Sequence, residues 1–174
     1  MPLCLCSSLV SCASAADPPG GPPDPEPPLI VRVAPESGAV LTEPPRSVEV
    51  AFNEVISERI PGPRQDISSA VILSPVRGET RVAWRRNRLE IWPQEGFERG
   101  RVYHLQLLPV IRDLRDNRLA RGRVVVFSTG PQLPEATLSG TLVDWIGARA
   151  AALALVEAVL LPDSLPYRTI TDSS

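Results

Sequence analysis

The sequence that decides the fold is RVYHLQLLPVIRDLRDNRLARGRVVVFSTG, residues 101–130. Its first part alternates apolar Tyr103, Leu105 and Leu107 with polar side chains, which is the period-2 pattern of a strand that buries one face. A segment rich in Asp and Asn follows, as expected for a turn. A β-branched and aromatic run then ends at Ser-Thr-Gly. We therefore expect a strand, a turn and a second strand here.

The same pattern continues on the N-terminal side of this stretch. Short apolar runs separated by turn residues cover residues 29–34, 47–53, 70–73, 79–84 and 88–92. We expect Leu29, Val31 and Val33 to share one face of the first strand, and Val48, Val50 and Phe52 to share one face of the second. In the hairpin that follows, the side chains expected to face inward are Val82, Trp84, Leu89 and Ile91. Short strands with a turn about every ten residues predict an all-β protein, built as an antiparallel β-sandwich.

The composition limits the chemistry that the chain can perform. The chain has 174 residues, of which 43% are hydrophobic, and a net charge of -2 that gives no basic field to attract nucleic acid. Its cysteines are Cys4, Cys6 and Cys12, so the later residues contain neither a disulfide framework nor a zinc site. A single histidine, His104, leaves little for acid–base catalysis. We predict no catalytic residue, no cofactor and no metal.

The N-terminal residues 1–16, MPLCLCSSLVSCASAA, are similar to the end of a secretory signal. Leu9-Val10-Ser11-Cys12 resembles a bacterial lipobox, in which the thiol of Cys12 would take the lipid. No Arg or Lys precedes this apolar part, and the part is short. Cleavage after Ala13-Ser14-Ala15, with release, is an alternative, as is an N-terminus without a targeting role. The expected location is extracytoplasmic, either lipid-anchored or secreted.

Residues 17–28, DPPGGPPDPEPP, are expected to form an extended linker, because proline fixes φ and removes backbone donors. The interpretation is a spacer between the N-terminal segment and the first folded part, residues 29–131. Recognition by a proline-binding domain is the alternative.

The serial order of the motifs in this folded part resembles the bacterial Ig-like domain of the S-layer-protein type, over about residues 29–130. The motifs are Ala-Pro-Glu-Ser-Gly-Ala (34–39), Val-Glu-Val-Ala-Phe-Asn-Glu-Val (48–55), Leu-Glu-Ile-Trp-Pro (89–93), Gly-Arg-Val-Tyr-His-Leu (100–105), Arg-Asp-Leu-Arg-Asp-Asn-Arg-Leu (112–119) and Phe-Ser-Thr-Gly (127–130). The resemblance implies a structural or spacer module of the cell envelope, with no catalytic residues to carry over. Asp116 stands where that family usually has Gly, although Asp tolerates the left-handed conformation better than most residues.

The C-terminal residues 132–174 are expected to form a partial second β module. Residues 139–145 are typical of a strand, whereas AAALALVEAVLL, residues 150–161, has helix-favouring composition but strand-like alternation. The segment resembles the first half of a carboxypeptidase-regulatory-like domain, a transthyretin-like sandwich. The motifs are Gly-Thr-Leu-Val-Asp (140–144), Val-Glu-Ala-Val-Leu-Leu-Pro (156–162) and Tyr-Arg-Thr-Ile-Thr-Asp-Ser-Ser (167–174). A truncated product with exposed strand edges is the expectation.

Four groups of side chains are candidates for ligand chemistry. Asp113, Asp116 and Asn117 offer oxygens, but Ca²⁺ wants six to eight, so the interpretation is a solvated turn. His104 has no nucleophile pattern beside it and is interpreted as exposed or satisfied. The tip WRRNR, residues 84–88, is more typical of a charged hairpin end than of a nucleic-acid or anionic-glycan site. The possible sugar platforms are Trp84, Trp92 and Trp145.

Three functions remain open at this point. The first is a non-enzymatic envelope module acting as a spacer or interaction domain, with the membrane (through Cys12) and other envelope proteins or glycans as partners. The second is a carbohydrate-binding module that uses Trp84, Trp92 or Trp145, and it requires at least one of these rings to be exposed. The third is a fragment of a larger receptor or surface enzyme.

Overall fold

The structure is a computed structural model that describes residues 24–62, 65–130, 132–133, 138–161 and 164–171. The lipobox segment, including Cys12, lies outside these residues. Seven antiparallel strands form two sheets, ordered β1-β2-β5-β4 and β3-β6-β7. Their bounds are β1 (Ile30–Ala34), β2 (Val48–Phe52), β3 (Val71–Ser74), β4 (Thr80–Trp84), β5 (Arg88–Pro93), β6 (Val102–Leu107) and β7 (Arg123–Ser128). This is the strand order of a seven-stranded immunoglobulin sandwich, and it confirms the predicted fold class.

The core lies between the two sheets and uses the predicted alternation. Strand β2 pairs with β5 in the register Val50↔Leu89, and β6 pairs with β7 in the register Leu105↔Val125. Inward side chains from both sheets are buried, among them Val48, Val50, Phe52, Leu89, Ile91, Tyr103, Leu105, Leu107, Val125 and Phe127. A short 3-10 helix, Ile67–Ala70, adds Ile67 and Ala70 to this core ahead of β3.

Strand β1 corrects one prediction. Leu29 and Val31 are 55% and 62% exposed, whereas Val33 is buried, so the expectation that all three share one face is wrong. The β1–β2 register shifts between Ile30 and Arg32. Such a bulge adds one residue to one strand and exchanges the faces beyond it. Ile30 consequently packs against the core instead.

The chain then crosses from the first sheet to the second. After β1, Gly38 N donates to Val126 O at 2.7 Å and Leu41 N donates to Ser128 O at 2.8 Å. Val40 forms a parallel bridge with Ser128. Residues 38–41 therefore cover the outer edge of β7, which would otherwise offer unpaired backbone groups to another strand.

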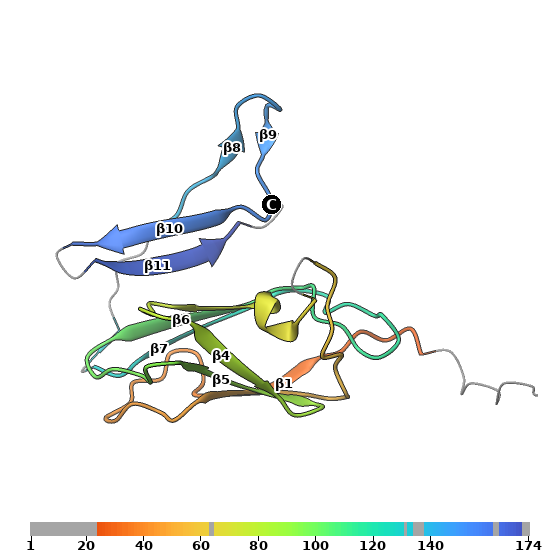
Figure 1. Ribbon diagram of the computed structural model, residues 1–174, viewed down its shortest axis with the longest axis horizontal. Coiled ribbons are helices and arrows are strands. Elements are labelled where there is room, and N and C mark those ends of the chain that lie inside the picture. The colour runs from red at the N-terminus through yellow and green to blue at the C-terminus, as the bar shows by residue number, and fades with distance from the viewer. Residues whose placement is uncertain (1–23, 63–64, 131, 134–137, 162–163, 172–174) are drawn as a thin grey trace, which may run out of the picture.

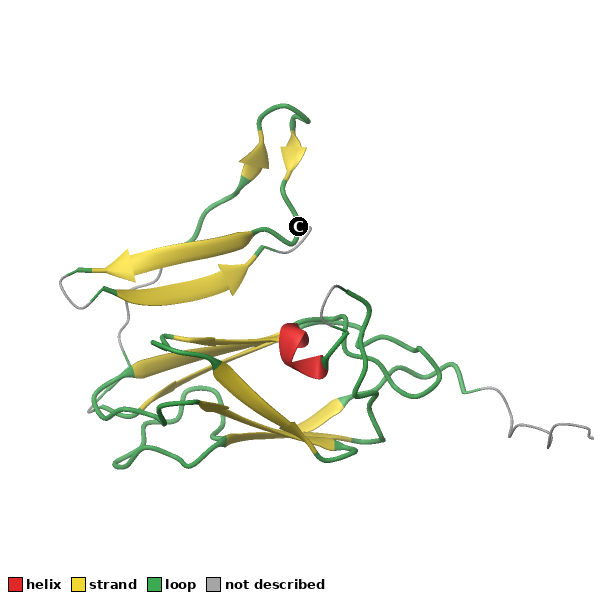
Figure 2. Cartoon of the chain, viewed as in Figure 1, coloured by secondary structure: helices red, strands yellow, loops and turns green. Residues whose placement is uncertain are grey.

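The C-terminal part contains two further hairpins. Strands β8 (Val143–Asp144) and β9 (Arg149–Ala150) form one, and β10 (Leu155–Leu160) and β11 (Leu165–Ile170) form the other. The ambiguous run at 150–161 is thus a strand over its second half, because β10 is paired with β11 along its length. Figures 1 and 2 show this second hairpin beside the sandwich, with β11 nearer to it than β10.

Candidate functional site

The junction between the sandwich and the β10–β11 hairpin is centred on Gln106, an outward-facing residue of β6. Its Nε2 donates to Ile170 O at 3.0 Å, and its Oε1 accepts from Ile170 N at 2.9 Å. The same Oε1 accepts from Thr169 Oγ1 at 3.0 Å. The side-chain amide therefore offers the edge of β11 one donor and one acceptor, as a backbone amide of a neighbouring strand does.

A second contact closes the same junction. Ser74, the residue of β3 that pairs with His104 of β6, donates from Oγ to Arg168 O at 3.2 Å and is only 1% exposed. Leu165, at the start of β11, is 2% exposed. It lines a cavity of about 10 Å³ together with Pro75, Val76 and Tyr103. Because a cavity of this size holds at most one water, the hairpin and the sandwich are in close contact here.

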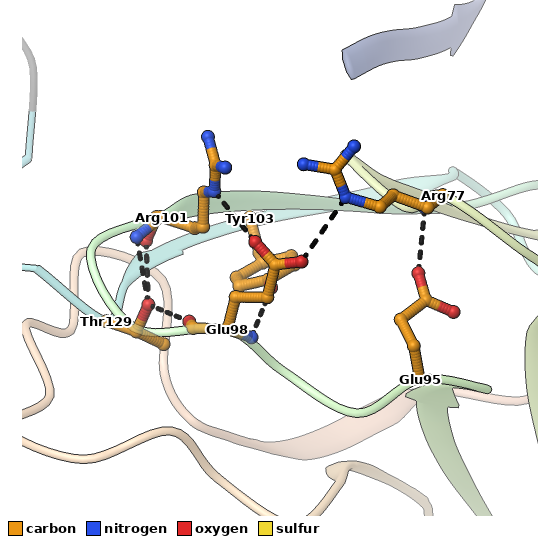
Figure 3. A network of polar contacts seen from close by, with 6 residues as sticks. All are labelled: Arg77, Glu95, Glu98, Arg101, Tyr103 and Thr129. Carbon is orange, nitrogen blue, oxygen red and sulfur yellow. Dashed lines mark hydrogen bonds and ion pairs between the residues drawn. The ribbon is translucent and has the colours of Figure 1, made fainter. Parts of the chain in front are cut away.

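Tyr103 anchors the loop beneath this cavity (Figure 3). Its hydroxyl accepts a hydrogen bond of 2.7 Å from the backbone N–H of Glu98, five residues upstream. This is the arrangement of the tyrosine corner that immunoglobulin sandwiches place at the start of the corresponding strand. Thr129 extends the network by donating from Oγ1 to Glu98 O at 2.7 Å. Burial raises the pKa of Tyr103 above its usual value.

The carboxylates beside Tyr103 are occupied by neighbouring groups. Glu98 forms ion pairs with Arg101 at 3.1 Å and with Arg77 at 3.5 Å. Glu95 accepts from Arg77 N at 2.7 Å and from Gly78 N at 3.3 Å. Desolvation by burial acts to raise the pKa of Glu95, but these hydrogen bonds and one from its own backbone outweigh it and hold the pKa below the usual value. The network therefore joins the loop after β3 to the loop before β6.

The three tryptophans proposed as sugar platforms lie in different environments. Trp84 is half-buried against the core, and its Nε1 donates to Ile56 O at 3.0 Å. Trp92 is also half-buried and pairs with Arg81 on the outer face of β5. Trp145, in the turn between β8 and β9, is 91% exposed. The structure does not bring the rings together, and Trp145 is the one that meets the exposure requirement.

The loop with Asp113, Asp116 and Asn117 is a turn with an exposed tip that includes Asp116, but the expectation of a solvated turn is wrong for Asp113. Asp113 is 3% exposed and accepts from Arg115 N at 2.7 Å and from Asn117 Nδ2 at 2.7 Å. Asp116 has a φ of 71°, in the left-handed region that we predicted it would tolerate. Asn117 Nδ2 also donates to Asp24 O at 2.8 Å, which attaches the end of the proline-rich segment to the sandwich.

The described residues contain no group of three or more His, Cys, Asp and Glu side chains placed to hold a metal ion. No helix in this part of the chain is long and apolar enough to cross a bilayer. His104 is half-buried beneath the C-terminal hairpin, on the same outer face as Gln106, and burial lowers its pKa.

Sequence reasoning missed the junction residues Ser74, Gln106 and Leu165. Gln106 follows the polar phase of an alternating strand, and that pattern predicts only a side chain facing solvent. The signal that could have found it is the presence of a second β module after β7, which requires some contact with the first.

One family model, described as a bacterial Ig-like domain, matches residues 24–129. The match begins inside the segment that we expected to be linker, in agreement with the hydrogen bond from Asn117 to Asp24. No curated protein matches the chain.

Proposed function

The chain belongs to the bacterial Ig-like domain family, and we propose that it is a non-enzymatic module of the bacterial cell envelope that acts as a rigid spacer or interaction domain. Domains of this family are typically structural modules displayed at the bacterial surface. The proposal extends this general role to a specific one, in which the sandwich holds a second β module at a fixed distance and orientation.

The observation that carries the spacer role is the junction at Gln106. The three hydrogen bonds of its side chain, the bond from Ser74 to Arg168 and the burial of Leu165 all act between the sandwich and β11. A flexible linker alone would leave the two parts free to reorient. Contacts that involve both backbone and side chains restrict that motion, which is what a spacer needs.

Distance measurements between spin labels test the spacer role. Glu43 and Arg149 have side chains that are 76% and 80% exposed, so cysteine labels there leave the core intact. The chain for this experiment carries Ser in place of Cys4, Cys6 and Cys12. A rigid spacer gives one narrow distance distribution, which broadens in the variant Gln106→Ala. A broad distribution in the parent chain contradicts the proposal.

We further propose that Cys12 carries a lipid and that residues 17–28 hold the sandwich away from the membrane. The lipobox-like Leu9-Val10-Ser11-Cys12 supports this proposal. Expression of the chain with its natural N-terminus, followed by mass spectrometry, tests it. A diacylglyceryl mass on an N-terminal Cys12 and loss of membrane association in Cys12→Ser are the expected results. An unmodified Cys12 on a chain outside the membrane fraction contradicts them.

A second candidate function is carbohydrate binding through Trp145. Its ring is 91% exposed, and an exposed indole is a surface on which a sugar ring can stack. Titration of cell-wall glycan fragments, followed by tryptophan fluorescence, tests this function. Binding must be lost in Trp145→Ala and kept in Trp92→Ala, because Trp92 is half-buried in the sandwich. Equal binding by the two variants removes this candidate.

A further inference from the structure

The outer edge of β10 has unpaired backbone groups, and their positions follow from the hydrogen bonds of β11. In an antiparallel pair, successive residue pairs point their N–H and C=O groups alternately toward the partner strand and away from it. Thr171 N donates to Ala154 O at 3.0 Å, so this pair points inward. The next pair, Leu155 and Ile170, points outward, which explains why Ile170 is free to bond Gln106.

The same alternation places the backbone groups of the rest of the strand. Glu157 pairs with Arg168 and Val159 pairs with Pro166, two positions further each time. Their N–H and C=O groups therefore also point outward. The Arg168 carbonyl confirms the alternation because it accepts from Ser74 on the outer side of β11, and Pro166 occupies a position that needs no inward donor. On β10, the outward N–H and C=O groups belong to Leu155, Glu157 and Val159, and no backbone group among the described residues bonds to them.

Three other edge strands, β1, β7 and β11, have an edge that is covered or distorted among the described residues, whereas the outer edge of β10 is regular. Residues 38–41 cover β7, a bulge interrupts β1, and Gln106 covers β11. Strand β10, LVEAVL, contains no proline or lysine, and its register with β11 is regular throughout. A regular apolar edge of this kind is a template for another strand.

The side chains around this edge are apolar and exposed. Leu153, Leu155, Val156, Val159 and Leu161 are 66%, 61%, 38%, 51% and 77% exposed. A strand paired at this edge would cover part of this apolar surface. Pairing at this edge would also widen the two-stranded ribbon, which on its own is the least stable form of sheet.

We propose that β10 pairs antiparallel with β10 of a second copy of this chain, about a two-fold axis at Glu157. This register places Leu155 opposite Val159 of the second copy, and Val159 opposite Leu155 of the second copy. Apolar side chains therefore meet on both sides of the axis. All three outward-pointing residues of each strand then exchange N–H···O bonds. Glu157 is held by Arg168 at 2.7 Å, so the four charges at the axis sum to zero. The two hairpins become one four-stranded sheet.

Disulfide trapping tests the pairing and its register. The full chain with Ser at positions 4, 6 and 12 is given one cysteine, either by Glu157→Cys or by Leu155→Cys. At the axis, residue 157 faces its own copy at about 5.5 Å between Cα atoms, which a disulfide can bridge. Mild oxidation should therefore trap a dimer with Glu157→Cys and little with Leu155→Cys. Equal trapping at the two positions overturns the register.

Sedimentation of the full chain over a concentration series tests the association without cross-linking. The substitution Val159→Pro removes an outward N–H and leaves the β10–β11 bonds in place, so the dimer should weaken by at least about tenfold. The matched control Val159→Ala should stay within a few fold of the parent chain. Where Val159→Pro changes the circular dichroism spectrum, Val159→Lys serves instead, because it adds a charge and keeps every backbone donor.

Three outcomes overturn the proposal. The first is a parent chain that stays monomeric at every concentration, which leaves the edge to a strand of a different protein. The second is a dimer that neither the proline nor the lysine variant weakens. The third is an absence of trapped dimer with Glu157→Cys. A failure here leaves the spacer role intact, because that role rests on the Gln106 junction and is tested by the label distances.

Discussion

The side chain of Gln106 and the backbone of Ile170 form a pair of hydrogen bonds, at 3.0 Å and 2.9 Å, that connects the two parts of the chain. The side chain of this one residue thus bonds the backbone of β11 in the way that a neighbouring strand would in a continuous sheet. It satisfies one donor and one acceptor on the edge of β11, and the side chains of Leu165 and Ile170 add apolar contacts with the sandwich.

The substitution Gln106→Ala should loosen the C-terminal hairpin without unfolding the sandwich. It leaves the N–H and C=O of Ile170 without their partner, and the loss should cost about 1–3 kcal/mol of docking free energy. Hydrogen exchange measures this directly, as faster exchange at Ile170 with unchanged protection at Leu105. The control is Gln94→Ala, since the side chain of Gln94 accepts a hydrogen bond from the exposed side chain of Arg81, far from the junction. Equal exchange at Ile170 in both variants contradicts the proposed role of Gln106.

The positions of the strands in the sandwich could be predicted from the sequence because each strand buries one face. In β2, β5 and β6, burial imposes a period of two, and this period is visible in the residue types alone, whereas β7 is marked by its β-branched and aromatic composition. The same reasoning gave the wrong face for part of strand β1. Leu29 and Val31 continue the alternation in the sequence, but a bulge turns them away from the face of Val33. A bulge changes the register and leaves no mark on the pattern of residue types.

The junction was beyond sequence reasoning for a different reason. Gln106 lies on the polar phase of its strand and Ser74 directly follows the apolar run 70–73, and at such positions a side chain in water and one that bonds a distant backbone have the same residue type. The partner residues are distant in the sequence, since Ile170 lies 64 positions after Gln106. The exposure of Trp145 was also beyond sequence reasoning. A tryptophan is equally compatible with core packing, and the position of Trp145 in the turn between β8 and β9 is what leaves it exposed.

The substitution Tyr103→Phe should destabilise the sandwich by about 0.5–1.5 kcal/mol. The ring stays in place against Phe127, with centroids 5.5 Å apart, and only the bond from Glu98 N to the hydroxyl is lost. Urea unfolding gives the difference in free energy. The control is Tyr167→Phe, at a half-buried position for which the structure shows no corner contact. A loss at Tyr103 no larger than at Tyr167 contradicts the corner.

Stability should decrease as the pH falls below 7 because of His104. Burial lowers the pKa of this histidine in the folded chain, so the unfolded chain binds the proton first. The contribution of His104 is therefore fully present above its ordinary pKa of about 6.5 and is lost as the pH falls through the lower, folded pKa. Melting temperatures at pH 7 and pH 5 measure it. In His104→Gln, the decrease between these two values should be smaller, and an equal decrease shows that His104 is not responsible.

The substitution Phe127→Ala should be the most damaging of these changes, at about 3–5 kcal/mol. Phe127 is fully buried and contacts two other rings, Phe97 at 5.7 Å and Tyr103 at 5.5 Å between centroids. Its removal leaves a cavity in the core next to the tyrosine corner, so the loss exceeds that of the hydroxyl in Tyr103→Phe. The matched control lies on the same strand: Val124 points outward and is 46% exposed, so Val124→Ala should stay within about 0.5 kcal/mol of the parent chain. Chemical unfolding of the two variants compares the faces of β7, and similar losses in both would show that the strand does not divide the core from the surface as described.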